Sequence, residues 1–342
     1  MSLRPPARRL AEAGSKILLT TQPGWAFATI EELRGLGVPG RFPRYHRDSS
    51  LLVPDLGKTE PDELGTPAIV CGIVHDAGST GRDDAVSELT KGLKPKALKE
   101  RTLNLLRGST GGGHRRFSIS TEAYGRTTLH RKQLASAIEN AVKAAFPRWR
   151  RSPDAGARFL CKADPEYAVL ALQLHTNLGG DHGERPGSLR EHLAAGLLTI
   201  AGTSRDGAVF DPFMGTGTIL KVASEAFRAG PTIGLEVSRE TYEEAERRLK
   251  GTGSKIFNRR FEDFDMRSLP ADASLVSNVP FGRRFPRASS EVLTELVNGS
   301  PFRSKRSTLL MSREQAMEVS KETDLRSRNV LVLGQPASIA YG

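Results

Sequence analysis

The second half of the chain is a regular alternation of short apolar runs and amphipathic segments, and this pattern constrains the fold most. The runs "GAVFD", "TIGLEV" and "ASLVSNVP" read as strands and alternate with the helix-like "TILKVASEAFRAG", "RETYEEAERRLK" and "SSEVLTELVNG". Strands that alternate with helices predict a mostly parallel sheet covered on both faces, as in a Rossmann-like α/β domain. The final stretch, "NVLVLGQPASIAYG", predicts an antiparallel strand pair at one edge.

The first half is less regular and predicts an α+β region. "GARFLCKA" and "YAVLALQLHT" read as an antiparallel strand pair, and "HRKQLASAIENAVKAAF" reads as an amphipathic helix. The glycine-rich segment 177–187 is the best linker, so we expect domains at 1–180 and 181–342. After it, "PGSLREHLAAGLLTIAG" predicts a helix with Ser188 as N-cap and Glu191 as capping-box partner.

Positive charge is concentrated in the first half. The formal net charge is +11; residues 1–190 hold 29 Lys and Arg against 20 Asp and Glu, and the remainder holds 21 against 19. A basic half beside a near-neutral half predicts a module for a polyanion such as nucleic acid.

The composition also predicts the cellular compartment of the protein. No apolar run approaches the roughly 20 residues of a membrane helix, and the N-terminus shows no secretory signal. Cys71 and Cys161 lie in apolar stretches, which predicts buried thiols in a reducing cytoplasm. The histidines follow no metal-ligand spacing, so we expect no metal site.

A glycine turn after the first of the strands in the second half predicts a ligand site. In "VFDPFMGTGTIL", Asp211 ends a strand, Gly215 and Gly217 follow, and Thr218 begins a helix. Glycines let the backbone approach a ligand, and a helix N-terminus offers unpaired N–H groups. A pyrophosphate would be repelled by Asp211, whereas a ligand with an ammonium or sulfonium group would be attracted.

Acidic residues at the next two strand ends suggest the rest of that ligand. Glu236 follows "IGL" at the place where nucleotide-binding sheets hold the two ribose hydroxyls. Asp265, or else Asp263, in "FEDFDMRSLP" could accept a hydrogen bond from the exocyclic amine of an adenine.

The stretch "SNVPFG" predicts chemistry on an aromatic amine. If the Asn278 side-chain oxygen and the Val279 carbonyl accept the two N–H bonds of that amine, its nitrogen can pyramidalise and aim its lone pair. Pro280 stiffens the turn, and Phe281 offers a ring on which a base can stack. Alignment and electrostatics would supply most of the acceleration, because the proton is lost after attack.

These motifs resemble those of class I S-adenosylmethionine-dependent methyltransferases that methylate amino groups of nucleic acids. "DPFMGTGTI" is similar to their first motif, DPFxGxGT, which brings in Pro212 and Phe213, and "NVPFG" is similar to their catalytic (N/D)PP(Y/F) motif. The resemblance implies S-adenosyl-L-methionine as cofactor, bound by the motif residues and with Asn278 beside it. Val279 replaces the usual first proline; its carbonyl is retained, although we expect a looser turn.

The first half extends the resemblance to THUMP-containing RNA methyltransferases, and most closely to tRNA guanine-N2 methyltransferases. "LLTTQPGWAFATIEELRGLG", "RRFSISTEAYGRTTLHRKQLASAIENAV" and "YAVLALQLHTNLG" are similar to that family in order along the chain. The resemblance implies a ferredoxin-like and THUMP region that docks RNA, with tRNA the expected class, before the catalytic domain. The candidate RNA contacts are Arg115, Arg116, Arg131, Lys132, Arg283, Arg284 and Arg287.

Two other functions remain open on the sequence. The catalytic motif does not exclude an adenine-N6 methyltransferase acting on DNA or RNA. An RNA-binding protein with a degenerate site is a third reading, which only Val279 supports. The RNA, the modified position, the number of methyl groups and the oligomeric state are not predicted.

Overall fold

The structure, a computed structural model, divides into two compact units. It describes residues 16–46, 48–79, 85–106, 115–124, 131–165, 167–178, 188–204, 206–281, 288–299 and 306–342. One unit comprises Met1–Thr21 and Leu33–Thr176, and the other comprises Gln22–Glu32 and Asn177–Gly342. The second unit therefore includes a short segment from near the start of the chain, which carries most of helix α1 (Ala26–Gly35).

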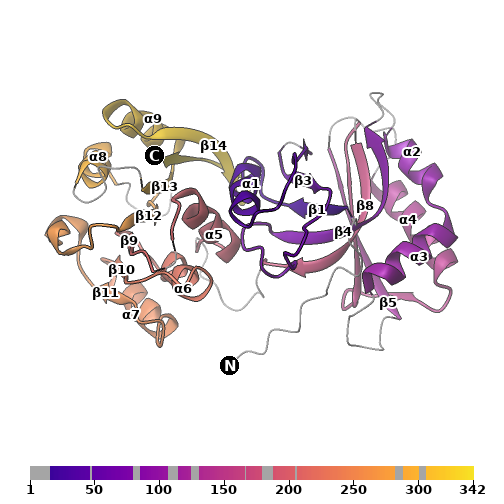
Figure 1. Cartoon of the computed structure of the whole chain (residues 1–342), viewed down its shortest axis with the longest axis horizontal. Coiled ribbons are helices and arrows are strands. Elements are labelled where there is room, and N and C mark those ends of the chain that lie inside the picture. Colours follow the sequence, from indigo (N-terminus) through magenta and orange to yellow (C-terminus); the bar gives the residue numbers. More distant parts are fainter. Residues whose placement is uncertain are drawn as a thin grey trace. The chain divides into compact units, whose positions relative to one another are not determined.

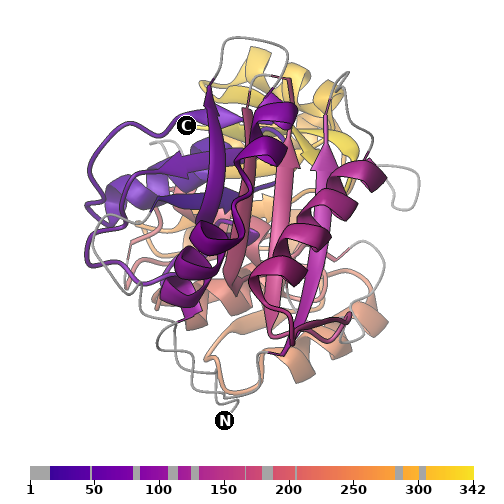
Figure 2. The ribbon, with the colours of Figure 1, turned by 90° about the vertical axis from the view of Figure 1, so that its right-hand side faces the viewer.

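The first unit is an α+β layer built on one eight-stranded sheet in the order β2-β3-β1-β4-β8-β7-β5-β6. The predicted pair at 157–163 and 167–176 is confirmed, since β7 and β8 are antiparallel. Helices α2, α3 and α4 lie over one face of this sheet (Figure 2). The elements are β1 (Ile17–Thr20), β2 (Arg44–Tyr45), β3 (Ser50–Val53), β4 (Ile69–Ser79), α2 (Ala85–Gly92), α3 (Pro95–Leu106), β5 (Arg116–Ala123), α4 (Arg131–Ala145), β6 (Arg150–Arg151), β7 (Ala157–Ala163) and β8 (Tyr167–Thr176).

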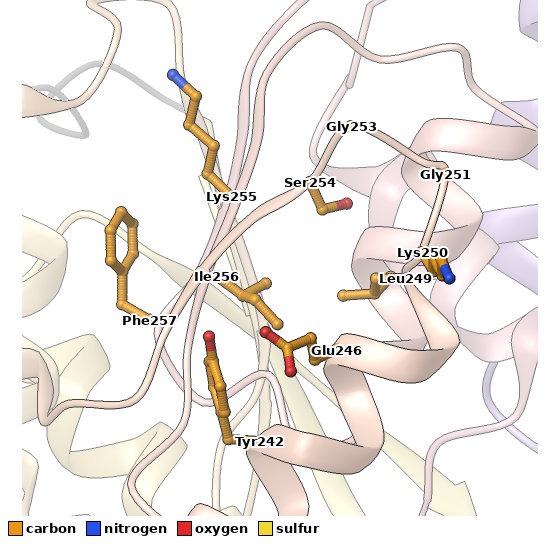
Figure 3. A pocket seen from close by; sticks show the side chains of 10 residues that line it. All are labelled: Tyr242, Glu246, Leu249, Lys250, Gly251, Gly253, Ser254, Lys255, Ile256 and Phe257. Atoms are coloured by element: carbon orange, nitrogen blue, oxygen red, sulfur yellow. The ribbon is translucent and has the colours of Figure 1, made fainter.

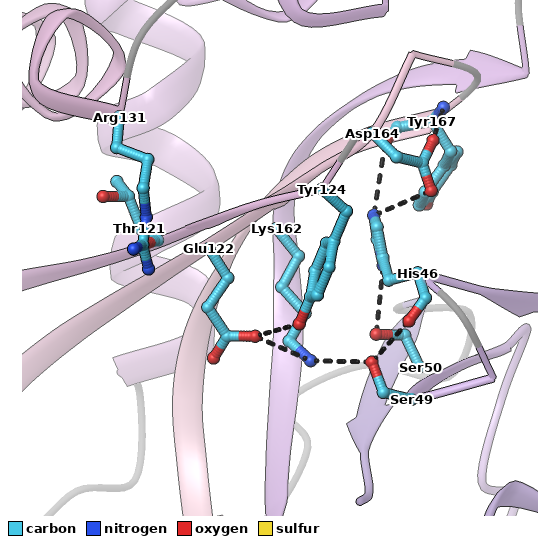
Figure 4. Close-up of polar contacts among 10 residues, drawn as sticks. All are labelled: His46, Ser49, Ser50, Thr121, Glu122, Tyr124, Arg131, Lys162, Asp164 and Tyr167. Atoms are coloured by element: carbon cyan, nitrogen blue, oxygen red, sulfur yellow. Dashed lines mark hydrogen bonds and ion pairs between the residues drawn. The ribbon is translucent and has the colours of Figure 1, made fainter. Parts of the chain in front are cut away.

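A buried polar network joins strands of the first sheet (Figure 4). The Lys162 ammonium lies 3.1 Å from Glu122 and 3.4 Å from the Ser49 hydroxyl. His46 is held between the Ser50 hydroxyl and the Tyr167 carbonyl, and burial lowers its pKa to about 4. Because Lys162 and His46 both have partners, the network fits a structural role in this unit.

The second unit is the predicted α/β domain, with a seven-stranded sheet in the order β11-β10-β9-β12-β13-β15-β14. Strands β11 to β13 in that order are parallel, and β15 pairs antiparallel with both β13 and β14, which confirms the closing hairpin (Figure 1). The elements are α5 (Glu191–Ile200), β9 (Val209–Asp211), α6 (Thr218–Glu225), β10 (Thr232–Leu235), α7 (Arg239–Arg248), β11 (Lys255–Phe257), the 3-10 turns η1 (Phe261–Asp263) and η2 (Met266–Ser268), β12 (Ser274–Asn278), α8 (Ser290–Asn298), β13 (Ser307–Met311), α9 (Arg313–Glu322), β14 (Arg326–Val332) and β15 (Gln335–Tyr341).

Both faces of this sheet are buried, as parallel strands require. Successive strand residues point to opposite faces, so Val209 joins one apolar cluster and Phe210 joins the other. The first cluster contains side chains of α5, α6 and α7, and the second contains side chains of α8 and α9. This sandwich fixes the strand ends that carry the motif residues.

The predicted capping box at the start of α5 is wrong. The helix begins at Glu191 with Arg190 as its N-cap residue, and no side chain caps it. Ser188 lies within hydrogen-bond distance of Thr216 in the glycine turn, at 3.0 Å, and Glu191 pairs with Lys221 of α6 at 3.0 Å. Both side chains are thus used between elements of the domain and not within the helix.

Candidate active site

The predicted motif residues lie at the carboxyl edge of the second sheet. Asp211 ends β9, Glu236 follows β10, and Asn278 ends β12. Strand β9 lies between β10 and β12 and is parallel to both, so the three carboxyl ends point the same way. The chain leaves β9 toward β10 on one side and returns through β12 on the other, which is the kind of switch point where open α/β sheets bind ligands.

The two glycines of the turn serve different structural purposes. Both have positive φ angles, 54° at Gly215 and 80° at Gly217. A Cβ added to Gly217 would lie 2.7 Å from the Leu249 side chain, whereas one added to Gly215 would meet nothing within 4 Å. Gly217 therefore lets α7 pack closely against the turn, while Gly215 leaves open space beside the backbone. Pro212 is buried and Phe213 half-buried in the same turn.

The N-terminus of α6 is supported by a cation. Thr218 is the first residue of this helix, and its hydroxyl accepts a hydrogen bond from Arg248 at 2.9 Å. Arg248 also donates to the Thr216 hydroxyl at 3.2 Å. Since Arg248 ends α7, this contact and the Leu249 contact together join the glycine turn to α7.

Asp211 is a buried carboxyl group, only 1% exposed. Its Oδ1 accepts from the Ser277 hydroxyl at 2.5 Å and from the Phe213 backbone N–H at 3.2 Å. Burial raises the pKa of Asp211 to about 7. The hydrogen bonds from Ser277 and Phe213 act in the opposite direction and lower this pKa, whereas repulsion from Glu236 raises it. The group is therefore costly to ionise until a cation approaches.

Glu236 lies half-buried at the end of β10. Its Oε1 accepts from the Ser238 N–H at 2.7 Å, and its carbonyl accepts from the Asn258 side chain at 2.7 Å. The next residue, Val237, which the sequence motifs do not single out, is 64% exposed although apolar. An exposed apolar side chain beside an acid at a sheet edge offers a flat base a contact surface. Its position directly after Glu236 is the signal that could have found it.

The loop after β11 carries the two candidate acids. Both Asp263 and Asp265 are exposed. Asp265 is the N-cap of η2, and its Oδ1 accepts from the Arg267 N–H at 3.0 Å. Asp263 lies at the end of η1. A cap through Oδ1 alone does not remove Asp265 as an acceptor, so both acids stay predicted acceptors for a ligand.

The catalytic motif is held more firmly than the sequence suggested. Val279 is 1% exposed, and its N–H donates to the Leu310 carbonyl at 2.9 Å, which continues the contact between β12 and β13. A proline could not make this bond. At this residue a hydrogen bond and a buried side chain stand where the usual motif has a proline ring.

The other motif residues present one unused acceptor. Among the described residues, the buried Oδ1 of Asn278 has no hydrogen-bond partner. Pro280 and Phe281 are half-buried, and Phe281 packs against the apolar cluster that includes α5. Ten other buried side-chain atoms among the described residues also have no hydrogen-bond partner. Asn278 Oδ1 differs from them in its place at the carboxyl end of β12, the edge of the sheet where open α/β proteins bind ligands.

A separate hollow of about 620 Å³ lies between α7 and β11 (Figure 3). Tyr242, Glu246, Lys255 and Phe257 contribute to its lining. None of the predicted cofactor or catalytic residues lines it, so it is distinct from the strand-end site.

The predicted RNA contacts that the structure describes do not form one cluster. Arg115 and Arg116 are exposed at the start of β5, whereas Arg131 donates through Nε and Nη2 to the Thr121 carbonyl, five residues along that strand. At about 3.3 Å per residue, the two places are roughly 16 Å apart. Lys132 is exposed next to Arg131. Arg283, Arg284 and Arg287 lie outside the described residues.

The described residues contain neither a metal-ligand cluster nor a membrane-spanning helix. No group of three or more His, Cys, Asp or Glu side chains among them could hold a metal ion. In that same part of the chain, no helix has the length and apolar character to cross a membrane. Cys71 and Cys161 are both free and buried, as expected, and burial raises the pKa of each thiol to about 12.

Comparison with known protein families shows what kind of domain the second unit contains. Residues 181–298 match the family model described as RMKL-like, methyltransferase domain. The second unit contains a methyltransferase domain. This match also supports S-adenosyl-L-methionine as the cofactor. No curated protein sequence matches the chain.

Solved structures share the fold of the methyltransferase domain and of the region before it. TrmN from Thermus thermophilus superimposes with a TM-score of 0.70 at 18% identity, over 95% of this chain and 98% of that one. A possible methylase from Clostridium difficile 630 gives 0.66 at 13%, over 96% and 98%. SMU.472, complexed with SAH, gives 0.62 at 14%, over 97% and 99%. These likenesses confirm the Rossmann-like fold of class I methyltransferases.

Proposed function

We propose that this chain is an S-adenosylmethionine-dependent RNA methyltransferase that modifies the exocyclic N2 amine of a guanosine in tRNA. The observation that carries the proposal is the buried Asn278 Oδ1 without a partner, at the carboxyl end of β12 in a methyltransferase domain. An amine N–H of the target base would supply the missing donor. The Val279 carbonyl, fixed by the bond from Val279 N–H to Leu310, would accept the second one.

The strand-end residues fit the cofactor, which supplies an electrophilic methyl group when bound. We assign its amino group to Asp211 Oδ2, because both donors to this carboxyl use Oδ1. Glu236 would hold the ribose hydroxyls, Val237 the face of the adenine, and Asp265, or else Asp263, its exocyclic amine. The open space beside Gly215 lets the backbone approach the cofactor, and the N-terminus of α6 at Thr218 lies next to it.

Replacing the buried acid Asp211 should weaken cofactor binding and at the same time stabilise the protein without ligand. In Asp211→Asn we expect S-adenosylhomocysteine affinity to fall at least about 100-fold, since the charge that attracts the amine is lost. The same variant should be more stable without ligand. The folded pKa of about 7 exceeds the ordinary value of 3.8 for an aspartate, so the wild type loses stability as pH rises from about 4 through 7.

The gain at pH 8 should be roughly 4 kcal/mol, from about 1.4 kcal/mol per pKa unit over the rise from 3.8 to about 7. Thermal unfolding at pH 5.5 and 8 checks this, with exposed Asp263→Asn as the matched control that should show no such pH dependence. Equal stability of Asp211→Asn and wild type at pH 8 would contradict the assigned cost of ionisation.

RNA is proposed as the substrate on charge and fold. Residues 1–190 carry the positive excess, and the exposed Arg115, Arg116 and Lys132 belong to the first unit. Counterion release from phosphates favours such a surface. We accordingly propose that residues 1–180 form a THUMP-like RNA-docking region in cytoplasmic tRNA processing and that residues 181–342 carry the chemistry. Arg283, Arg284 and Arg287 are proposed contacts on the sequence alone.

The product nucleoside tests the function. Purified full-length protein, labelled S-adenosylmethionine and bulk RNA should give N2-methylguanosine after digestion to nucleosides. N6-methyladenosine in its place would establish the adenine-N6 alternative, which the Asn278 geometry also permits. Absence of transfer together with absence of cofactor binding would favour the degenerate RNA-binding protein.

A further inference from the structure

Ser277 links the cofactor acid to the strand that carries Asn278. It is fully buried on β12, one residue before Asn278, and its hydroxyl lies 2.5 Å from Asp211 Oδ1 at the end of β9. The two strands are parallel neighbours, with Leu275 opposite Phe210. The hydroxyl therefore joins two strand ends that lie 66 residues apart in the chain.

This contact acts on the charge of Asp211. A hydroxyl that donates to a carboxylate stabilises the ionised form, and such charge-assisted bonds are stronger than neutral ones. The charged or polar groups that face Asp211 are Ser277 from β12, the Phe213 N–H from the glycine turn, and Glu236 from the end of β10. Glu236 opposes ionisation, so the two donors alone favour it.

We propose that Ser277 is a positioning residue that orients the Asp211 carboxylate for the amino group of the cofactor and anchors β12 next to Asn278. This inference rests on the proposed cofactor site. It predicts that cofactor affinity depends on the Ser277 hydroxyl although Ser277 itself does not touch the cofactor. Asp211→Asn removes the charge itself, whereas Ser277→Ala leaves the charge and removes its support.

The test is the pH dependence of S-adenosylhomocysteine affinity, measured by calorimetric titration of full-length protein between pH 6 and 8.5. In Ser277→Ala the loss of a donor raises the pKa of Asp211 further, so a larger fraction is protonated near neutral pH. We expect affinity about tenfold below wild type at pH 6.5 to 7 and within about threefold at pH 8.5. Ser277→Thr, which keeps a hydroxyl, should restore most of the affinity at pH 7.

A matched control is Ser274→Ala, which removes a hydroxyl from another buried position of β12 and should leave the pH profile unchanged. An unchanged affinity of Ser277→Ala at every pH would overturn the inference, as would a loss equal at all pH values, which would show a merely structural role. A wild-type chain that binds no S-adenosylhomocysteine would overturn the proposed function and the inference with it.

Discussion

Asn278→Ala should lower the rate of methyl transfer to RNA at least about 1,000-fold. Its Oδ1 is the buried acceptor to which we assign the target amine, and removal of a single preorganised polar group at a reacting centre costs about 100- to 1,000-fold. Loss of alignment between amine and methyl group adds to this cost. Labelled methyl transfer under single-turnover conditions measures the effect on chemistry alone.

A titration of the same variant with S-adenosylhomocysteine distinguishes the two roles predicted for Asn278, which are binding of the target amine and binding of the cofactor. Affinity within a few-fold of wild type would restrict Asn278 to the amine, and a loss above tenfold would add a cofactor contact. Asn298→Ala is the matched control, because Asn298 is exposed at the end of α8, the helix that follows β12, and its side-chain N–H donates to the Glu322 carbonyl at 3.5 Å. Undiminished transfer by Asn278→Ala would refute the proposed mechanism.

Trp25→Ala should lower the free energy of unfolding of the methyltransferase domain by about 3 to 5 kcal/mol, the usual range for a buried large aromatic residue. Trp25 is 3% exposed and belongs to the same apolar cluster as α5. Its ring lies so close to Gly196 that a Cβ there would be 3.1 Å away, and its Nε1 donates to the Leu331 carbonyl at 3.0 Å. The variant loses both the packing and this hydrogen bond.

Urea unfolding of the full-length chain measures the loss, with Met317→Ala as control, because Met317 is 63% exposed on α9. A fragment that begins at residue 177 lacks residues 22–32 and should aggregate, since it exposes the surface that Trp25 covers. A stable, soluble fragment of that kind would contradict this account of the domain.

Local patterns were enough to predict the elements of the second unit. The strands around Phe210, Ile233 and Leu275 are short and apolar because both faces of a parallel sheet are buried. In the helices between them, apolar residues recur with a period of about 3.6 residues. Glycine and acidic residues stand at strand ends because only there can polar groups meet a ligand without disrupting the core. These signals are local, so a single sequence reveals them.

Residues whose partners lie far along the chain could not be placed from the sequence alone. Ser188 has the local signature of an N-cap, yet its hydroxyl lies 3.0 Å from that of Thr216. Val279 looked like a weakened motif, because nothing in the sequence shows that the Leu310 carbonyl is placed to accept its N–H.

The sequence by itself therefore determined the α/β class, the order of the strands along the chain and the side chains available at their ends. The tertiary structure decided which of those side chains meet. Strand order places β12 beside β9 and so brings Ser277 to Asp211. Burial of Trp25 in the core of the domain brings its Nε1 to the carbonyl of Leu331, 306 residues away. The physical reason is that sheet pairing and core burial act between segments distant in sequence, while propensity and periodicity act within one segment.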